Sequence, residues 1–265
     1  MKRGFSLVEL SIVLVILGLL TGGILAGQSL IRASELRAVT AEYQRYAAST
    51  QTFRDKYFAY PGDFRDATKF WSRQINAAHC PTNSGVATIN ASSGACDGDG
   101  DGLMDYAVAG TEAGEMFQFW RHLALAGLIE GSYTGLAGAG DFRQSDVGIN
   151  IPKSKISTGG WGGVRYSGSF AGDANDFAID VGNMFEYGGQ TVWYPSGGIL
   201  RPEEAWNIDT KMDDGKPASG KVIGRFWNNI CSAADDGSSA NNDLVASYRL
   251  TDTALRCALI FRHLF

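Results

Sequence analysis

The apolar residues of the first sixty positions form the strongest pattern in the chain. From Phe5 to about Leu25 the sequence is almost entirely apolar, with Glu9 as its single charge. About 20 apolar residues are what a helix needs to cross the hydrocarbon core of a membrane. The pattern therefore predicts a membrane-spanning helix over about residues 5–27. The basic Lys2 and Arg3 place the start of the chain on the cytoplasmic side and the remainder outside.

Beyond the apolar run, the same helix is predicted to continue with one apolar face. Side chains recur at alternating spacings of three and four: Leu36, Val39, Tyr43, Tyr46, Thr50, Phe53 and Tyr57. This period is typical of a helix that packs one side on a domain. The charged residues off this stripe are predicted to face solvent: Arg32, Glu35, Arg37, Glu42, Arg45 and Asp55. Turn residues from Tyr60 to Asp63 end the helix, which would be about 80 Å long.

Shorter elements are predicted downstream. Helical periods cover Asp63–Ile75 and Thr111–Ile129, and Pro202 is suited to the first turn of a third helix. β-branched and aromatic residues predict strands at Gly163–Tyr166, Phe177–Val181, Thr191–Tyr194 and about Leu255–Phe261. Within the second helix, Arg121 and His122 are interpreted as surface or packing residues without a chemical role.

The segment Lys2–Leu10 resembles the N-terminus of type IV pilins and of type II secretion pseudopilins. A short basic leader ends in Gly4, Phe5 follows, and Glu9 falls within a Ser-Leu-Val-Glu-Leu sequence. The resemblance implies that a prepilin peptidase cuts between Gly4 and Phe5, that Phe5 is then methylated, and that Glu9 helps to seat each subunit in a filament.

Three more common kinds of N-terminal segment fit the apolar run less well. An ordinary signal peptide has a shorter apolar core and a small-x-small cleavage site, of which Leu25-Ala26-Gly27 is a poor version. A plain signal anchor with an unrelated ectodomain is the second alternative. A lipoprotein is excluded, because no cysteine precedes Cys80.

The resemblance also implies an α+β, pilin-like fold. Residues 1–4 are then the leader, residues 5–60 the long N-terminal helix, and residues 61–265 a globular ectodomain. The outer half of the helix would pack on a small antiparallel sheet. A large helical and loop insertion over about Pro61–Tyr133 would be added to it.

Charge and cysteine content narrow the classes of partner and compartment. Removal of Lys2 and Arg3 changes the formal net charge from −5 to −7, which argues against nucleic acid as a direct ligand. All four cysteines lie beyond the membrane segment, as expected in an oxidising compartment, and they permit three pairings. Proximity favours Cys80–Cys96, and a Cys231–Cys257 bridge would tie the last strand to the sheet.

An aspartate-rich loop predicts a calcium site. Asp97, Asp99 and Asp101 match positions 1, 3 and 5 of an EF-hand loop, and Asp105 falls at position 9. Position 12 is Val108, so the usual bidentate glutamate is missing there. Glu112, Glu115 or a residue from a distant loop could substitute for it, and a merely solvated acidic turn is the alternative.

A second acidic segment, Ile208–Gly215, resembles one found near the C-terminus of many pilin-like proteins. Asp209, Asp213 and Asp214 could bind a cation there, although a helix end followed by an Asp-Asp-Gly turn explains them as well. Catalysis finds no support, because His79, His122 and His263 have no metal-ligand spacing and no hydrolase or phosphate-loop pattern occurs. No enzyme activity is therefore predicted.

The sequence thus predicts a structural subunit of a type IV pilus or a type II secretion pseudopilus. The large ectodomain favours a minor or tip subunit, whereas the largest pseudopilins typically lack the glutamate kept here as Glu9. The expected location is the inner membrane, with the ectodomain in the periplasm, and then a filament of pilin or pseudopilin subunits. The alternative is a membrane-anchored, calcium-dependent binding ectodomain, which would keep Met1 and lack a methylated Phe5.

Overall fold

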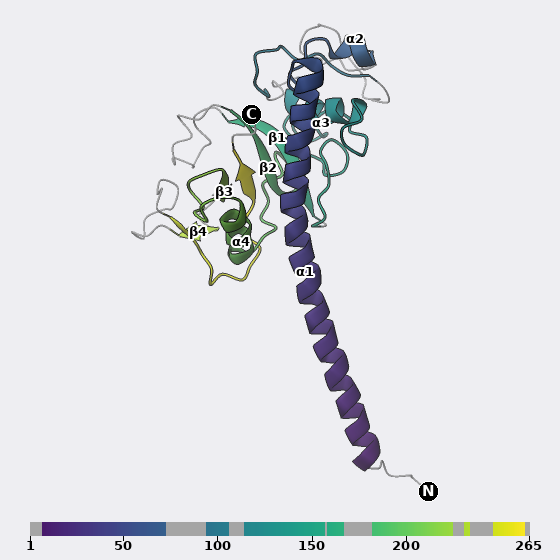
Figure 1. Cartoon of the computed structure of the whole chain (residues 1–265), viewed down its shortest axis with the longest axis vertical. Helices are drawn as coiled ribbons and strands as arrows, with labels where there is room; N and C mark the ends of the chain where they lie inside the picture. Colours follow the sequence, from purple (N-terminus) through teal and green to yellow (C-terminus); the bar gives the residue numbers. More distant parts are fainter. Residues whose placement is uncertain are drawn as a thin grey trace.

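One long helix dominates the structure, and a globular domain packs against it. The computed structural model describes residues 7–72, 94–105, 114–156, 158–166, 182–224, 231–233 and 246–262. Helix α1, Leu7–Tyr57, is 51 residues long, and the globular domain packs along only its outer half, the half away from the N-terminus (Figure 1). Residues 7–26 are all exposed. Within the described residues, α1 is the one helix that is long and apolar enough to cross a membrane.

The apolar stripe predicted for the outer half of α1 is confirmed. Val39, Tyr46, Thr50 and Phe53 are buried, and the other members of the stripe pack against the core with part of their surface. Tyr46 lies edge-on to both Trp120 and Trp161, with ring centroids 5.0 and 5.8 Å away. These aromatic contacts join the helix to the domain.

The prediction that Glu42 faces solvent is wrong. Its side chain is only 7% exposed and accepts three hydrogen bonds from the domain. The donors are the Ser154 hydroxyl at 2.6 Å, the Trp161 indole Nε1 at 2.8 Å and the backbone N–H of Lys155 at 2.9 Å. A buried carboxylate is tolerated because these donors offset its lost hydration. Glu42 therefore binds α1 to the domain.

Arg32, also predicted to face solvent, is half-buried against helix α4, Pro202–Met212. Its Nε and Nη2 atoms lie 2.6 and 2.7 Å from the two carboxylate oxygens of Glu204. The Glu204 carboxylate also accepts the backbone N–H of Arg201 at 2.8 Å, next to the first turn of α4. This two-pronged pair joins α4 to α1 at the point where the apolar half of α1 ends.

The predicted small antiparallel sheet is present. Its strand order is β1-β2-β6-β3, with β1 Gly159–Tyr166, β2 Gly182–Gly189, β6 Leu259–Phe261 and β3 Val222–Gly224. A separate pair joins β4, Ser232–Ala233, to β5, Ser247–Tyr248. Phe185 pairs with Phe261 across β2 and β6, and Tyr43 of α1 stacks on Phe261 with ring centroids 4.7 Å apart. The sheet thus packs on the stripe of α1.

Two strand predictions need correction. Gly163–Tyr166 is confirmed within β1, but Thr191–Tyr194 is a bend. The Thr191 hydroxyl donates to the carbonyl of Tyr194 and accepts the backbone N–H of Trp193, which closes the chain locally. Near the C-terminus, only Leu259–Phe261 of the predicted strand forms the sheet. Phe177–Val181 lies outside the described residues.

Two of the helices after α1 are shorter than predicted. Helix α2 covers only Ala67–Trp71, because Asp63 and Phe64 instead hold the aspartate-rich loop and Ser72 takes a positive φ of 62°. Helix α3, Glu115–Leu125, confirms the centre of the second prediction. It ends earlier because Gly127 adopts a left-handed φ of +72°. Helix α4 begins at Pro202, as predicted.

Arg121 and His122 are packing residues, as interpreted. The His122 ring is fully buried, accepts the backbone N–H of Gly62 at Nδ1 (2.9 Å), and donates from Nε2 to the carbonyl of Cys96 (3.0 Å). Burial lowers its pKa to about 3. Arg121 binds the backbone carbonyls of Tyr133 and Gly94. Both residues tie the loop before α3 to the helix.

The predicted Cys231–Cys257 disulfide is present, with the two Cα atoms 4.9 Å apart. It links β4 to the segment before β6 across 26 residues, which corresponds to about 3 kcal/mol of stabilisation on a loop-entropy argument. Cys96 is also disulfide-bonded. Its predicted partner, Cys80, lies outside the described residues.

Candidate functional site

The inner half of α1 presents an apolar surface without a covering domain. Hydroxyl groups within it are satisfied internally: Ser11 donates to the carbonyl of Val8 and Thr21 to that of Leu17, both at 2.9 Å. The helix can therefore lie in hydrocarbon without leaving these hydroxyl groups unpaired. Glu9 is exposed on this half. Gly4 and Phe5, the predicted processing junction, lie outside the described residues.

At the opposite end of the molecule, the aspartate-rich loop is held between the end of α1 and the start of α3. Asp63 of the turn after α1 accepts the backbone N–H groups of Gly100 (2.5 Å), Asp101 (3.1 Å) and Gly102 (2.9 Å). Gly100 and Gly102 adopt φ of +72° and +90°, which lets the chain turn around this carboxylate. Asp63 thus holds the loop through three hydrogen bonds from its backbone.

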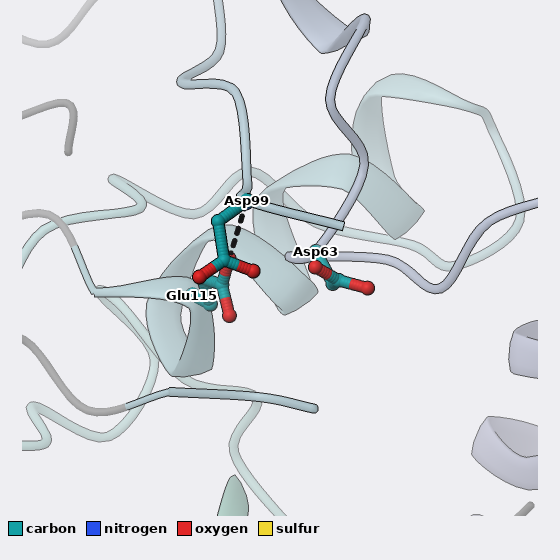
Figure 2. Close-up of side chains that lie close together, drawn as sticks. All are labelled: Asp63, Asp99 and Glu115. Atoms are coloured by element: carbon teal, nitrogen blue, oxygen red, sulfur yellow. Dashed lines mark hydrogen bonds between the residues drawn. The ribbon is translucent and has the colours of Figure 1, made fainter. Parts of the chain in front are cut away.

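Glu115, the first residue of α3, holds the other side of the loop. Its two oxygens accept the backbone N–H groups of Asp99 and Asp105, each at 2.9 Å. Figure 2 shows the side chains of Asp63, Asp99 and Glu115 close together, with the Asp99–Glu115 hydrogen bond dashed. Asp63 and Glu115 are only 3 and 4% exposed. Two buried carboxylates from separate elements therefore flank the exposed Asp99.

Oxygen atoms in this region are close enough to share one cation. Asp63, Asp99 and Glu115 each offer an oxygen within 4.8 Å of the others, and Asp99, Asp101 and Asp105 form a second such group. Burial is the main cause that raises the pKa of Asp63 to about 6 and that of Glu115 to about 8. A hard divalent cation prefers such carboxylate oxygens and would favour their charged forms.

Asp97 has a different role from its neighbours. Its two carboxylate oxygens accept the backbone N–H and the side-chain hydroxyl of Thr68, each at 2.8 Å, near the start of α2. Asp105, in turn, forms a 2.5 Å ion pair with Arg165 of β1. The predicted set is therefore divided, because Asp97 fixes α2 whereas Asp99, Asp101 and Asp105 lie together.

The second acidic segment forms a turn at the end of α4. Asp209 accepts the Tyr248 hydroxyl at 2.9 Å and the backbone N–H of Gly215 at 3.1 Å, and burial raises its pKa to about 7. Asp214 accepts the Ser219 hydroxyl at 2.7 Å, and Asp213 accepts the backbone N–H groups that lead into β3. Oxygens of the three aspartates lie within 4.8 Å of one another. Each carboxylate nevertheless has a structural partner in this turn.

Comparison with known families concerns the start of the chain. Residues 1–25 match the family model described as the prokaryotic N-terminal methylation motif. The chain carries the prepilin-type N-terminal motif. This match is consistent with the type IV pilin and pseudopilin family, and so are the long helix and the small antiparallel sheet. A search of curated proteins and a search of solved structures found no match.

The methylation motif implies processing by a prepilin peptidase and assembly with other pilin subunits. It also supports a pilin-like structural subunit anchored in a membrane through α1. Sequence reasoning identified the acidic loop of this pilin-like chain and considered Glu115 as a substitute ligand. It missed Asp63, which it assigned to a turn and to the first residue of the next helix. The available signal was a carboxylate directly after Pro61-Gly62, at the point where the long helix ends beside the loop.

Proposed function

We propose that this chain is a subunit of a type IV pilus or type II secretion pseudopilus that is built through the inner half of α1. The observation that carries the proposal is the exposure of every residue from 7 to 26 on a helix whose outer half packs against its own domain. In the membrane, lipid covers this apolar surface. Outside the membrane, the corresponding helices of neighbouring subunits can cover it, and the methylation motif supports that assembly.

A minor or tip position is supported by the arrangement of the ectodomain. α2, α3 and the acidic loop lie around the outer end of α1, far from the N-terminus (Figure 1). A subunit with a large structure at its outer end is suited to a filament position where few other subunits lie beyond that end. Before assembly, Lys2 and Arg3 favour an inner-membrane location with the N-terminus in the cytoplasm and the ectodomain in the periplasm.

The role of Glu9 provides the test. Its carboxylate is costly in hydrocarbon, by a few kcal/mol, and we expect the amino group of processed Phe5, on the same or a neighbouring chain, to pair with it. Glu9→Leu should insert and lose its leader normally but be absent from sheared filaments. Asp55→Leu removes an exposed carboxylate from the outer half of the same helix and should assemble like the wild type.

Intact mass and filament yield give separate readouts of this test. Membrane-extracted wild-type protein should lack residues 1–4 and carry one extra methyl group. A full-length mass in cells with active prepilin peptidase would contradict the assignment and support a plain membrane-anchored ectodomain. Wild-type filament incorporation of Glu9→Leu would contradict the assembly role of the glutamate.

We also propose that the acidic loop binds calcium. Asp63, Asp99, Asp101, Asp105 and Glu115 are the residues that would hold the ion, in place of a set that includes Asp97. The support is the proximity of their oxygens and the burial of two of the carboxylates. The ion would supply positive charge at the centre of the loop, which reduces carboxylate repulsion and stabilises the outer end of the ectodomain.

A further inference from the structure

A cavity of about 420 Å³ opens between the end of α1 and the acidic loop. Aromatic side chains of Tyr57, Phe58 and Tyr60 form one part of its lining. The backbone of Gly100 and Gly102 lies on the acidic-loop side. Its volume lies within the range of small-molecule sites. The end of α1 that contributes to its lining lies at the opposite end of the molecule from the N-terminus (Figure 1).

Phe58 has a backbone conformation that its side chain disfavours. Its φ is +54°, and its N–H donates to the carbonyl of Arg54 at 2.8 Å directly after the last residue of α1. Glycine is the usual residue at this left-handed position, because a bulky side chain is unfavourable there. The phenylalanine ring is also 92% exposed. Neither helix capping nor core packing therefore explains a phenylalanine here, whereas a ligand contact at the edge of the cavity does.

Charged groups of both signs line the rest of the cavity. The Arg54 guanidinium lies 5.3 Å from the centroid of the Tyr60 ring, and the Arg65 Nε donates to the backbone carbonyl of Asp99. Asp66 supplies a half-exposed carboxylate, whereas the Asp63 carboxylate is buried and accepts backbone N–H groups of the acidic loop. The formal charges of these two guanidinium groups and two carboxylates balance. The cavity is therefore suited to a ligand that is polar but carries little net charge.

We infer that this cavity binds a neutral carbohydrate. A sugar ring has an apolar face of C–H groups, which stacks on exposed aromatic rings such as that of Phe58. Its hydroxyl groups both donate and accept hydrogen bonds, so adjacent hydroxyls suit planar guanidinium and carboxylate groups. An anionic ligand would meet the half-exposed carboxylate of Asp66. A purely apolar ligand would displace water from the charged lining without replacing the hydrogen bonds of that water.

This binding goes beyond the proposed role as a filament subunit and does not depend on assembly. The side chains that form the cavity all belong to one chain. The full chain in detergent micelles should therefore bind carbohydrate as a monomer. A failure to bind would leave processing and filament incorporation unaffected, so the two conclusions are tested separately.

The test combines a glycan array with calorimetric titration of the best neutral oligosaccharide, at a fixed millimolar calcium concentration. Phe58→Gly should reduce affinity about tenfold or more, because the stacking surface is lost. The same change should leave the melting temperature equal or higher, since glycine suits the left-handed position. Phe58→Tyr keeps an aromatic ring and should retain binding. Arg54→Gln should also weaken binding.

Trp206→Gln is the matched control. Trp206 is a partly exposed aromatic residue of α4, which lies near the middle of α1 and away from the cavity, and its loss should not change affinity (Figure 1). Reduced binding by Phe58→Gly with unreduced melting temperature would support the inference. The inference is overturned if no neutral glycan binds, if only acidic glycans or peptides bind, or if Phe58→Gly binds as tightly as the wild type.

Discussion

Glu42→Ala should destabilise the globular domain strongly, although position 42 follows the pattern of a solvent-facing residue. The Glu42 carboxylate is the shared acceptor for the Ser154 hydroxyl, the Trp161 indole and the Lys155 backbone N–H. Alanine would leave three donors without their acceptor in a buried site. The attachment of α1 to the domain would weaken at the same time.

The expected magnitude follows from these three contacts. Each buried donor left unsatisfied costs about 1–3 kcal/mol, and part of the sum is recovered because a buried charge is also removed. We therefore expect Glu42→Ala to lower the free energy of unfolding by about 3–5 kcal/mol. Glu42→Gln keeps the size and one acceptor oxygen, so about 1–3 kcal/mol is expected. Ser154→Ala removes one donor with little change in volume and should cost about 1 kcal/mol.

Urea denaturation of the full chain in detergent, followed by tryptophan fluorescence, measures these differences. Arg37→Ala is the control, because it removes an exposed charge from the same helix. The reasoning would be refuted if Glu42→Ala cost less than about 1 kcal/mol, or no more than Arg37→Ala. A change in the slope of the transition without a change in its midpoint would also contradict it, since stability itself is expected to change.

Two further predictions concern the outer end of the ectodomain. The pKa of His122 is lowered to about 3 in the folded chain, whereas an unfolded histidine has a pKa of about 6.5. Below about pH 6.5 the unfolded state therefore binds a proton that the folded state does not, and the free energy of unfolding falls progressively toward pH 3. At pH 5 this lowers the free energy of unfolding by about 2 kcal/mol. The dependence of stability on acid pH should lack this decrease in His122→Gln, and the same pH dependence in the variant and the wild type would contradict the prediction. Millimolar calcium should stabilise the chain by about 0.4–1.4 kcal/mol relative to chelator if the dissociation constant is about 10⁻⁴–10⁻³ M. Asp99→Ala with Asp101→Ala should abolish this shift in melting temperature, Asp97→Ala should keep it, and magnesium should substitute poorly; equal melting temperatures with calcium and chelator would reject the site.

The spacing of apolar residues along the sequence determined the long helix and the face that packs on the domain. A run of almost entirely apolar residues, followed by a stripe at spacings of three and four, predicts both halves of α1 from local information alone. Pro202 likewise indicates the start of α4, because the backbone angle that proline favours is a property of a single residue. The N-terminal motif is a contiguous string of residues, so it too is visible without a structure.

Only the tertiary structure decided which polar residues became partners. Glu42 lies off the apolar stripe, and its burial depends on donors 112 to 119 positions away in the chain. Asp63 joins the acidic loop through N–H groups 37 to 39 positions downstream. A periodic pattern of apolar residues indicates only which side of a helix or strand a residue occupies. Hydrogen bonding instead depends on the distance and direction between particular atoms, and the folded chain alone brings those atoms together.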